Sequence, residues 1–569
     1  MSPLHAPIDD AIREELKEFD DLTAALLARR GVTTRAEAET FLNPSYEDHI
    51  HDPLLLKNMH AAAKRVARAI HAGERITIWS DYDCDGIPGA VILHDFLKKA
   101  GANFDNYIPH RHLEGYGVNS EGIEKLAKAG TSLVITVDSG ITDNEAVAHA
   151  RELGMDVIVT DHHLPQPPMP DAIILDHKQE GETYPFKELC GAVMAWKLVC
   201  GVLAVDAPLR EKIPVGWEKW LLDMAALATI ADMMPLTGEN RVIVRYGLLV
   251  LRKSPRVGLQ KLCKAMRVNQ SRITEDDVAF MLAPRVNAAS RMGDPRYAFT
   301  LFTTSDEAEA ETLAKKLESL NRSRRASAGA ITKAVHAKLE ELKASGTIPS
   351  VIVLGDPEWR PALLGLVASG IASEYERPVF LWGREGNDTL KGSCRSWGNV
   401  HLVELMKAAK DAFAEFGGHA YSAGFSVAGD QIFKLSERLV AAREMLAESS
   451  EEDAVRADAP LALSAATFRL LSTLEKLAPY GQSNPKPVFG FENATVDAVA
   501  WFGKTGEHLR LSISDGFVEL EAISFFARRE LGKKADRLEK GSTVTVLGNL
   551  ERDQFSRSRV PRVRIVSLV

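Results

Sequence analysis

Residues 76–86 read ITIWSDYDCDG, an apolar run followed by three aspartates at alternate positions. In an extended backbone successive side chains point to opposite faces, so Asp81, Asp83 and Asp85 would share one side. Neighbouring carboxylates raise one another's pKa, and a hard cation such as magnesium or manganese relieves the repulsion. Gly86 then permits a tight turn into a helix. The stretch predicts a metal site at a strand end, with a solvated polar loop as the alternative.

The composition of the 569-residue chain is that of a globular protein, with 45% hydrophobic and 26% charged residues. Its length predicts about three or four domains. No apolar run approaches the ~18 residues needed to cross a membrane, and the N-terminus lacks the features of a signal peptide. The five cysteines form no CxxC pair, which argues against a zinc knuckle or a disulfide scaffold and for the reducing cytoplasm. A formal charge of −9 does not by itself indicate a nucleic-acid partner, although a basic groove can exist locally.

The strand-and-helix pattern repeats after residue 86. Three more apolar strands each end in acidic or imidazole side chains: 131–137 before Asp138-Ser139-Gly140, 155–160 before Asp161-His162-His163, and 172–175 before Asp176-His177. Apolar strands alternating with helices indicate an α/β domain with a parallel sheet covered on both faces. Ligands of such sheets bind beyond the carboxyl ends of the strands, so these residues predict a functional site there.

Two later segments carry weaker signals. Asp232 follows an apolar helix that breaks before Pro235, and turn chemistry alone would explain it. Residues 282–292, LAPRVNAASRM, place Arg285 and Asn287 among small residues. This composition suits the binding of phosphate or carboxylate, and a structural salt bridge is an equal alternative.

The second half of the chain predicts two more domains. Residues 306–342 contain few helix breakers and predict one long helix, or two, that joins two lobes and packs through a leucine-rich stripe. An α/β unit begins near residue 350, and its segments GSCRS (392–396) and GGHAYSAGF (417–425) fit a phosphate pocket or tight turns. After an acidic linker at 448–458, five short strands predict a small barrel such as an OB-fold, a common binder of single strands. The strands are 494–502, 508–513, 518–526, 542–550 and 560–569.

These motifs together resemble those of a known family. Asp81-Tyr-Asp-Cys-Asp-Gly, Asp138-Ser-Gly, Asp161-His-His and Ala231-Asp232 are similar, in this order, to the four motifs of the DHH phosphoesterases. GSCRS (392–396) and GGHA (417–420) are similar to the DHH-associated domain. RHLEGYG (111–117), LAPRVNAA (282–289) and LAPYGQSNP (477–485) resemble segments of the RecJ family of bacterial exonucleases specific for single-stranded DNA. The resemblance extends from about residue 45 to the end of the chain.

Four positions depart from the pattern of that family. They are Pro88 in place of a threonine, Asp176-His177-Lys178 in place of an Asn-Pro, Ser290 in place of a glycine, and Arg360 in place of a histidine. None of them replaces a motif aspartate or the Asp-His-His segment. The departures therefore concern rate, metal preference or substrate detail rather than the reaction itself.

The resemblance implies the fold class and the order of the domains. The fold class is α/β, with a parallel-sheet domain and a second α/β domain joined by a long helix, followed by a C-terminal β-barrel. The expected domains are an N-terminal helical lead-in (1–55), a DHH phosphoesterase domain (56–255), a helical connector (256–345), a DHH-associated domain (346–448) and an OB-fold single-strand-binding domain (455–569).

The resemblance also implies two divalent cations, Mn²⁺ or Mg²⁺, between the strand ends. The expected ligands are Asp83, Asp85, Asp138, His162 and Asp232, and this mixture of carboxylates and imidazole favours manganese. Asp81 and His163 are expected to be catalytic, as further ligands or as their partners. Metal ions in such sites activate a water and stabilise the charge that develops during attack on a phosphodiester. The expected substrate-binding residues are Arg111, Tyr116, Arg285, Asn287, Ser393, Arg395 and His419.

The implied activity is metal-dependent degradation of single-stranded DNA in the 5′→3′ direction to mononucleotides, in DNA repair and recombination. Arg111, Ser393 and Arg395 would hold a 5′ phosphate. The implied partners are 5′-phosphorylated single-stranded DNA, a single-strand-binding protein and a helicase, and the implied state is a cytoplasmic monomer without a membrane partner. One alternative is a DHH phosphoesterase for short oligonucleotides or cyclic dinucleotides, which the predicted barrel disfavours. The other is a non-catalytic DNA-binding scaffold, which the complete set of motif residues disfavours.

Overall fold

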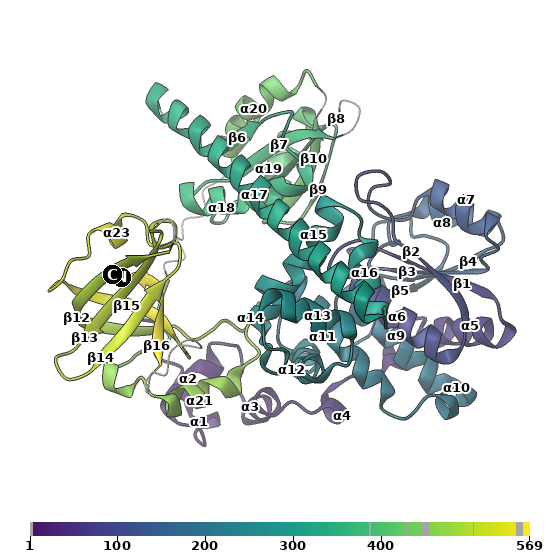
Figure 1. Ribbon diagram of the computed structural model, residues 1–569, viewed down its shortest axis with the longest axis horizontal. Helices are drawn as coiled ribbons and strands as arrows, with labels where there is room; N and C mark the ends of the chain where they lie inside the picture. The colour runs from purple at the N-terminus through teal and green to yellow at the C-terminus, as the bar shows by residue number, and fades with distance from the viewer. Residues whose placement is uncertain are drawn as a thin grey trace. The chain divides into compact units, whose positions relative to one another are not determined.

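Figure 1 shows the computed structural model, which describes residues 4–346, 348–385, 389–427, 429–446, 455–503, 506–552 and 561–569. The chain forms two compact units. The larger unit consists of Ala6–Asn321 and Phe468–Pro487. The smaller unit consists of Arg322–Thr467 and Val488–Val569, together with the described residues Leu4 and His5. No helix among the described residues is long and apolar enough to cross a membrane.

The larger unit is built on a parallel sheet of five strands in the order β2-β1-β3-β4-β5, as predicted. The strands are β1 (Arg75–Ser80), β2 (Asn103–Tyr107), β3 (Leu133–Val137), β4 (Asp156–Thr160) and β5 (Ile173–Leu175). The sequence pattern does not predict β2. This edge strand reads NFDNY and is only half-buried, so it lacks the continuous apolar run of a strand that is buried on both faces.

Helices cover both faces of this sheet and create two hydrophobic cores. Ile76 and Ile78 belong to the larger core, which includes α5 (Met59–Ala72), α6 (Gly86–Ala100), α9 (Gly191–Val205) and α11 (Leu222–Ala231). Trp79 and Val134 belong to the other core, with α7 (Ser120–Lys128) and α8 (Asn144–Glu152). Neighbouring residues of β1 therefore alternate between the two cores, as the pleat of a buried strand requires.

One buried arginine joins distant parts of the larger unit. The N-terminal lead-in contains the short helices α1 (Asp10–Glu15), α2 (Asp21–Ala28), α3 (Arg35–Leu42) and α4 (Tyr46–His49). Arg241, on α12 (Gly238–Lys253), donates to the carbonyl oxygens of Phe41 (2.7 Å), Leu477 (2.9 Å) and Ala478 (3.0 Å). The segment Phe468–Pro487 is thus fastened to the larger unit, although in sequence it interrupts the smaller one.

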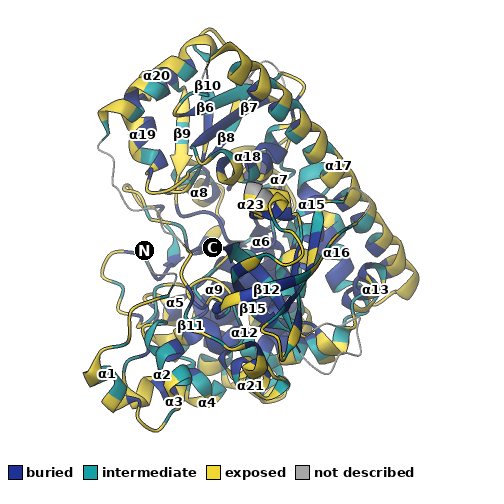
Figure 2. Ribbon diagram, turned by 90° about the vertical axis from the view of Figure 1, so that its left-hand side faces the viewer, coloured by how far each residue is buried: buried dark blue, intermediate teal, exposed yellow. Residues whose placement is uncertain are grey.

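The predicted connector is helical. Its elements are α13 (Val257–Met266), α14 (Glu275–Asp277), a π-helical turn (Val278–Leu282), α15 (Ala283–Met292), α16 (Arg296–Thr303) and α17 (Glu307–Ser345). The last of these is one continuous helix of 39 residues. Leu317, Val335 and Leu339 of the predicted stripe are buried, which confirms that the stripe serves packing. Many other residues of α17 are exposed (Figure 2).

The smaller unit contains the predicted second α/β domain. Its strands have the order β6-β7-β8-β10-β9, and only β6 and β7 run parallel to each other. The strands are β6 (Ile352–Gly355), β7 (Val379–Glu385), β8 (Thr389–Arg395), β9 (Glu415–Gly418) and β10 (Ser422–Val427), and the helices are α18 (Pro361–Tyr375), α19 (Leu402–Ala408) and α20 (Ile432–Met445). The mixed sheet follows from the short connections, because parallel neighbours need a crossover helix.

The predicted C-terminal barrel is present. Its strands are β12 (Phe489–Phe502), β13 (His508–Ser514), β14 (Glu519–Ser524), β15 (Thr543–Glu551) and β16 (Arg562–Leu568). They pair in the order β12-β13-β14-β16-β15, and pairing of β12 with β15 closes the barrel. The predicted acidic linker 448–458 lies largely outside the described residues, as does residue 560 at the start of the last predicted strand. The predicted domain borders stay predictions.

Candidate metal centre

The aspartates that follow β1 lie in a turn and not in an extended strand. β1 ends at Ser80, and α6 begins at Gly86. Between them, Oδ1 of Asp83 accepts hydrogen bonds from the backbone N–H groups of Asp85 (2.7 Å) and Gly86 (3.3 Å). The expectation that an extended backbone places these carboxylates on one side is therefore wrong. An aspartate that bonds its own downstream backbone forms a compact turn instead.

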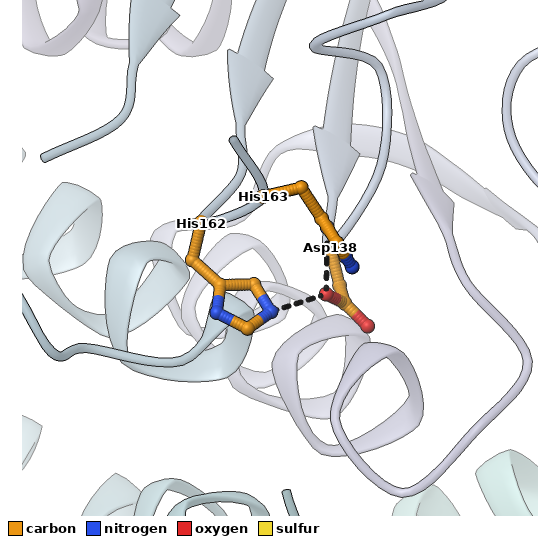
Figure 3. A group of neighbouring side chains, drawn as sticks. All are labelled: Asp138, His162 and His163. Atoms are coloured by element: carbon orange, nitrogen blue, oxygen red, sulfur yellow. Dashed lines mark ion pairs between the residues drawn. The ribbon is translucent and has the colours of Figure 1, made fainter. Parts of the chain in front are cut away.

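The seven side chains predicted to bind metal or to act in catalysis nevertheless lie together. Their ligand atoms form three overlapping groups within 4.8 Å: Asp81, Asp83 and Asp138; Asp85, His162 and Asp232; Asp138, His162 and His163. Figure 3 shows both imidazoles beside the carboxylate of Asp138. Nε2 of His162 lies 3.1 Å from Oδ1 of Asp138, 3.6 Å from Oδ2 of Asp85 and 3.8 Å from Oδ2 of Asp232. The carboxyl ends of neighbouring parallel strands, together with the end of α11 for Asp232, bring these residues together.

Asp138, which belongs to two of the three groups, occupies a constrained position. Its backbone has a φ of 59°, a left-handed conformation that non-glycine residues adopt rarely. A Cβ atom at Gly191 would lie 2.6 Å from the Cβ of Asp138, so only glycine allows α9 to begin there. The hydroxyl of Tyr116 donates to the carbonyl oxygen of Asp138 (3.0 Å). The surroundings of this residue therefore hold its strained backbone in place.

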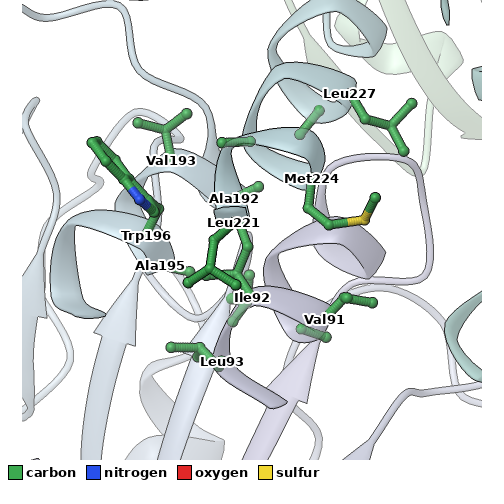
Figure 4. Close-up of a cluster of buried hydrophobic side chains, with 14 of the residues drawn as sticks. Val91, Ile92, Leu93, Ala192, Val193, Ala195, Trp196, Leu221, Met224 and Leu227 are labelled. Carbon is green, nitrogen blue, oxygen red and sulfur yellow. The ribbon is translucent and has the colours of Figure 1, made fainter. Parts of the chain in front are cut away.

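Two other candidate ligands are held by helices of the larger core. The carboxylate of Asp85 accepts hydrogen bonds from the first backbone N–H groups of α9, those of Gly191 (2.6 Å) and Ala192 (2.8 Å). The positive end of the helix dipole favours a carboxylate at this place. Asp232 directly follows α11. Figure 4 shows that apolar side chains of α6, α9 and α11 pack against one another, so the core fixes both positions.

The first residue of the Asp-His-His segment orients the two histidines. Oδ1 of Asp161 accepts hydrogen bonds from the backbone N–H of His162 (2.7 Å) and of His163 (3.2 Å), and it lies 2.8 Å from Nδ1 of His163. Its Oδ2 accepts the N–H of Ile141 (3.1 Å). Asp161 is absent from the three groups of ligand atoms among the described residues. It is a partner of the His163 imidazole and of the His162 backbone, a role that sequence reasoning did not predict.

Lys178, in a segment that departs from the family pattern, is a second residue that supports the Asp-His-His segment. Its Nζ donates to the carbonyl oxygen of His162 (2.6 Å). The neighbouring His177 is fully buried, and its Nε2 accepts the backbone N–H of Leu189 (2.8 Å). Residues 176–178 therefore support the metal centre through bonds to the backbone of neighbouring segments. The only sequence signal for this role was their place directly after a strand.

Burial and mutual repulsion raise the pKa values of the carboxyl groups. Burial first, and then the negative charge of neighbouring aspartates, raise the pKa of Asp81 and of Asp138. The same causes raise the pKa of Asp85 to about 6 and that of Asp232 to about 8. The cluster is therefore unfavourable as a set of bare carboxylates, and a bound cation would remove that cost.

The protein shifts the pKa values of the two histidines in opposite directions. Burial lowers the pKa of His162 to about 3, so its imidazole is neutral at physiological pH and keeps a lone pair for a metal ion. Burial also disfavours the charged form of His163, but the hydrogen bond and the charge of Asp161 outweigh it and raise the pKa of His163 to about 9. His163 therefore adds a positive charge beside the carboxylates.

The donor set fits a divalent cation. Oδ1 of Asp81 is buried and has no hydrogen-bond partner among the described residues. It belongs to the group with Asp83 and Asp138, whose carboxylate oxygens are the ligands that magnesium and manganese prefer. The group with His162 adds an imidazole, which suits manganese better than magnesium.

Two of the predicted substrate-binding residues lie beside the metal centre. Cζ of Arg111 lies 4.8 Å from the ring centroid of Tyr82, which belongs to the turn after β1. The hydroxyl of Tyr116 lies 3.3 Å from Nδ1 of His163, and Tyr116 is 49% exposed. An exposed ring at this place is available for stacking with a base.

Two others, Arg285 and Asn287 on α15, are engaged within the protein. Nε of Arg285 donates to Oε2 of Glu318 on α17 (2.6 Å), and Arg285 is 8% exposed. This ion pair is the structural alternative that the sequence left open for Arg285. Oδ1 of Asn287 accepts the backbone N–H of Cys84 (3.1 Å). Asn287 therefore contacts the turn that carries the candidate ligands.

The remaining predicted residues belong to the smaller unit. Ser393 and Arg395 occupy alternate positions of β8, and the guanidinium of Arg395 packs against Gly365 of α18, where a Cβ would lie 2.6 Å from Nη2. Among the described residues no carboxylate forms an ion pair with Arg395, whose Nη1 donates to the carbonyl oxygen of Cys394 (2.8 Å). Burial lowers the pKa of Arg395. His419 is exposed in the turn between β9 and β10.

Comparison with protein families identifies three domains along the chain. The DHH family N-terminal domain matches residues 75–229, the DHHA1 domain matches residues 348–448, and the RecJ OB domain matches residues 457–567. The sheet with the candidate metal centre, the mixed sheet and the closed barrel therefore define a protein of the DHH class.

Individual relatives show to which family within the DHH class the chain belongs. The chain is 33% identical to the single-stranded-DNA-specific exonuclease RecJ of Bacillus subtilis, over 99% of this chain and 70% of the relative. It is 31% identical to that of Escherichia coli, over 84% and 85%. Among solved structures, RecJ of Thermus thermophilus in complex with Mn²⁺ matches 100% of this chain and 78% of that chain, with a TM-score of 0.82 and 28% identity. The chain belongs to the RecJ family.

Proposed function

We propose that this protein is a divalent-metal-dependent exonuclease that degrades single-stranded DNA. The observation that carries the proposal is the convergence of five aspartates and two histidines at the carboxyl edge of the parallel sheet. The relatives from B. subtilis and E. coli, which match most of the chain, are named single-stranded-DNA-specific exonucleases. A cluster of this composition suits metal-assisted hydrolysis of a phosphodiester.

The metal ions would be Mn²⁺ or Mg²⁺, and two of them fit the grouping of the ligand atoms. Solved structures of T. thermophilus RecJ contain Mn²⁺ in one case and Mg²⁺ in another. One ion would be held by Asp83 and Asp138, and the other by Asp85, His162 and Asp232. When bound, such ions activate a water and stabilise the charge of the phosphorane-like transition state.

Other side chains of the protein orient the candidate ligands and are placed to contact the substrate. Asp161 fixes the orientation of the His163 imidazole and holds the backbone of His162 through its hydrogen bonds. Asp81 offers its unpartnered Oδ1 to a ligand or a water, and His163 places a positive charge at the side of the cluster where Tyr116 lies. Arg111, beside Tyr82, is suited to contact a phosphate of the strand. We assign Asp81 and His163 to catalysis and Arg111 and Tyr116 to the substrate.

The direction of degradation would be 5′→3′, because β8 offers a site for a terminal phosphate. Arg395 is a half-buried cation with no carboxylate partner among the described residues, and Ser393 lies two positions before it on the same strand. A guanidinium and a hydroxyl can both donate to a phosphate group, and the terminal phosphate carries more charge than an internal one. Gly365 leaves space for the guanidinium. The exposed imidazole of His419 would be a further contact.

The C-terminal barrel would bind the single strand. Its described residues include three guanidinium groups over aromatic rings: Arg528 over Trp501 (4.4 Å), Arg510 over Phe502 (5.3 Å) and Arg564 over Phe525 (4.2 Å). Cations and ring faces together are the groups that bind phosphates and stack with bases. This barrel argues against an enzyme of cyclic dinucleotides, and the complete metal cluster argues against a scaffold. Partnership with a single-strand-binding protein or a helicase, a monomeric state and a cytoplasmic location stay predictions.

The decisive experiment is digestion of end-labelled oligonucleotides by the purified protein. Single-stranded DNA, duplex DNA and RNA are compared with Mn²⁺, with Mg²⁺ and with a chelator. The proposal expects release of mononucleotides from the 5′ end of single-stranded DNA in the presence of either metal, and no release with the chelator. Release from the 3′ end would refute the polarity, and metal-independent cleavage would refute the metal centre.

A further inference from the structure

The turn after β1 carries candidate ligands that repel one another, and its backbone needs anchors. Some of these anchors are local, since Asp83 accepts the backbone N–H groups of Asp85 and Gly86, and Asp81 donates its N–H to the carbonyl oxygen of Val137. The N–H of Cys84 is different. It donates to the side chain of Asn287, which is 203 positions away in the sequence. Cys84 stands between two of the candidate ligands, so its backbone position affects both.

The helix that carries Asn287 is itself firmly fixed. Two positions before it, Arg285 pairs with Glu318 of α17 and donates from Nη1 to the carbonyl oxygen of Met281 (2.8 Å) in the π-helical turn. Ala288 and Ala289, which follow Asn287, are fully buried. α15 also packs against α11, the helix that ends before Asp232. Asn287 thus extends from a rigid support to the turn.

We infer that Asn287 is a positioning residue of the metal centre, which holds the turn of Asp81–Asp85 by accepting the N–H of Cys84. The inference rests on the proposed function, because it assigns the cluster to metal ions. In the absence of metal, repulsion between the carboxylates tends to open the turn, and this hydrogen bond opposes the opening. The turn is then already arranged for the cation, and less ordering is needed on binding.

The alternative role, contact with the DNA strand, uses the opposite end of the amide. A phosphate would be held by the donor Nδ2, whereas Cys84 requires the acceptor Oδ1. The two roles can therefore be separated by chemistry. Asn287→Asp keeps an acceptor for Cys84 but removes the donor and adds a negative charge that repels phosphate. Asn287→Ala removes both ends of the amide.

The test measures binding of Mn²⁺ to the metal-free full-length protein by calorimetry, so it has a readout other than activity. Loss of a partner that orients a ligand commonly lowers metal affinity by about 10- to 100-fold. We expect Asn287→Ala to weaken Mn²⁺ binding about tenfold and Asn287→Asp to retain the affinity of the unmodified protein. At saturating Mn²⁺ the KM for an oligonucleotide should be unchanged in Asn287→Ala.

Controls separate the inference from misfolding and from failure of the proposed function. Asn269→Ala is the matched control, because the side chain of the exposed Asn269 accepts the N–H and hydroxyl of the nearby Ser271; it should bind Mn²⁺ normally. Circular dichroism melting shows whether each variant is folded. The inference is overturned if Asn287→Ala binds Mn²⁺ like the unmodified protein while KM rises from the unmodified protein through Asn287→Ala to Asn287→Asp. If the unmodified protein binds Mn²⁺ but does not degrade DNA, the exonuclease proposal fails and the binding comparison still decides the role of Asn287.

Discussion

The metal centre of the larger unit and the end of β8 in the smaller unit both carry charge, of opposite sign, that their surroundings compensate only in part. The centre gathers five carboxylates, and among the described residues no lysine or arginine forms an ion pair with any of them. At the end of β8, Arg395 is a half-buried cation for which the described residues supply no carboxylate. Unpaired charge in a protein interior is costly. Its presence at two places is therefore a reason to expect two ligands, a cation at one and an anion at the other.

The two places also differ in how the protein holds them. Backbone N–H groups and distant side chains anchor the carboxylates from several directions, as the bonds of Asp85 and Asp161 show. Arg395 depends on one carbonyl oxygen and on the space beside Gly365. A rigid cluster of carboxylates suits a small metal ion with strict geometry. A guanidinium with fewer anchors, such as that of Arg395, suits the end of a DNA strand, which must enter and leave.

The largest effect is expected when the more rigid site loses a ligand. Asp138→Ala, or Asp83→Ala, should lower the rate of hydrolysis by at least about 10³-fold, more than the ~10–100-fold typical of outer partners, because the cation loses a direct ligand. Binding of single strands and the melting temperature should change little. The rate is measured with end-labelled single-stranded DNA at saturating Mn²⁺, and full activity in either variant would disprove the metal assignment.

The second effect concerns the barrel. Removal of Val488–Val569 should weaken binding of long single strands by about 100-fold or more, since each stacked base contributes roughly 1–3 kcal/mol. Binding is measured by fluorescence anisotropy at several salt concentrations, and cleavage of very short oligomers should be affected much less. Unchanged affinity for a strand well beyond the ~4–16 nucleotides that one OB-fold covers would contradict the role of the barrel.

The place of this truncation matters. A cut at residue 455 would also remove Phe468–Pro487, which supplies Arg241 with the carbonyl oxygens of Leu477 and Ala478. A buried guanidinium that keeps the carbonyl oxygen of Phe41 but loses its other acceptors destabilises the unit that contains it. A chain shortened at residue 455 should therefore melt at a lower temperature than one shortened at residue 488, and equal melting temperatures would show that the segment is dispensable.

The third effect tests the cation of β8. Arg395→Ala should reduce the preference for 5′-phosphorylated over 5′-hydroxyl strands by about 10- to 100-fold, the value of a charge-assisted hydrogen bond of roughly 1.5–3 kcal/mol. The preference is measured as the ratio of kcat/KM for the two substrates. Arg438→Ala, on α20 of the same unit, is the control and should leave the ratio unchanged. A lower melting temperature with an unaltered preference would identify Arg395 as a structural residue.

The smallest effect concerns the stability of the metal-free protein. The pKa of Asp85 is raised to about 6 and that of Asp232 to about 8, so between pH 4 and these values the folded chain binds protons that the unfolded chain has lost. For these groups, stability must therefore increase as the pH falls from about 8 toward 4. With a chelator present, we expect a melting temperature a few degrees higher at pH 6 than at pH 8.

Two further measurements make this pH dependence specific. Asp232→Asn removes the carboxyl group whose pKa is raised to about 8, so it should flatten the profile while raising the melting temperature at pH 8. Added Mn²⁺ should stabilise the protein more at pH 8 than at pH 6, because protons compete with the metal for the carboxylates. A profile that Asp232→Asn leaves unaltered would place the titrating groups elsewhere.

Sequence patterns predicted those parts of the molecule that depend on periodic burial or on complete motifs. The buried strands β1, β3, β4 and β5, the helix α17 and the closed barrel follow from apolar spacing. The edge strand β2 does not, because its partial exposure removes the pattern. The convergence of Asp81, Asp138 and His162 was predictable because parallel strands end at one edge of their sheet.

The features that the sequence did not predict depend on single hydrogen bonds, some of them local and some between distant residues. The turn of Asp83 replaces the extended backbone through a bond to its own chain. The roles of Asp161 and Lys178 follow from their bonds to the two histidines, and polar residues beside a strand end give no sign of which of them bind metal. Arg285 is paired within the protein because Glu318, 33 positions later, lies on the facing helix. Such pairings depend on tertiary structure.

The continuity of α17 fixes the direction of each of its side chains around a single helix axis. Each residue of an α-helix turns the chain by about 100° and advances it by about 1.5 Å. One residue inserted near Asn321 would therefore turn the buried positions Val335 and Leu339 by about 100° about the helix axis relative to Leu317, whereas seven inserted residues would leave a turn of only about 20°. Length changes in this helix therefore keep the spacing of its buried positions only in steps that restore the phase.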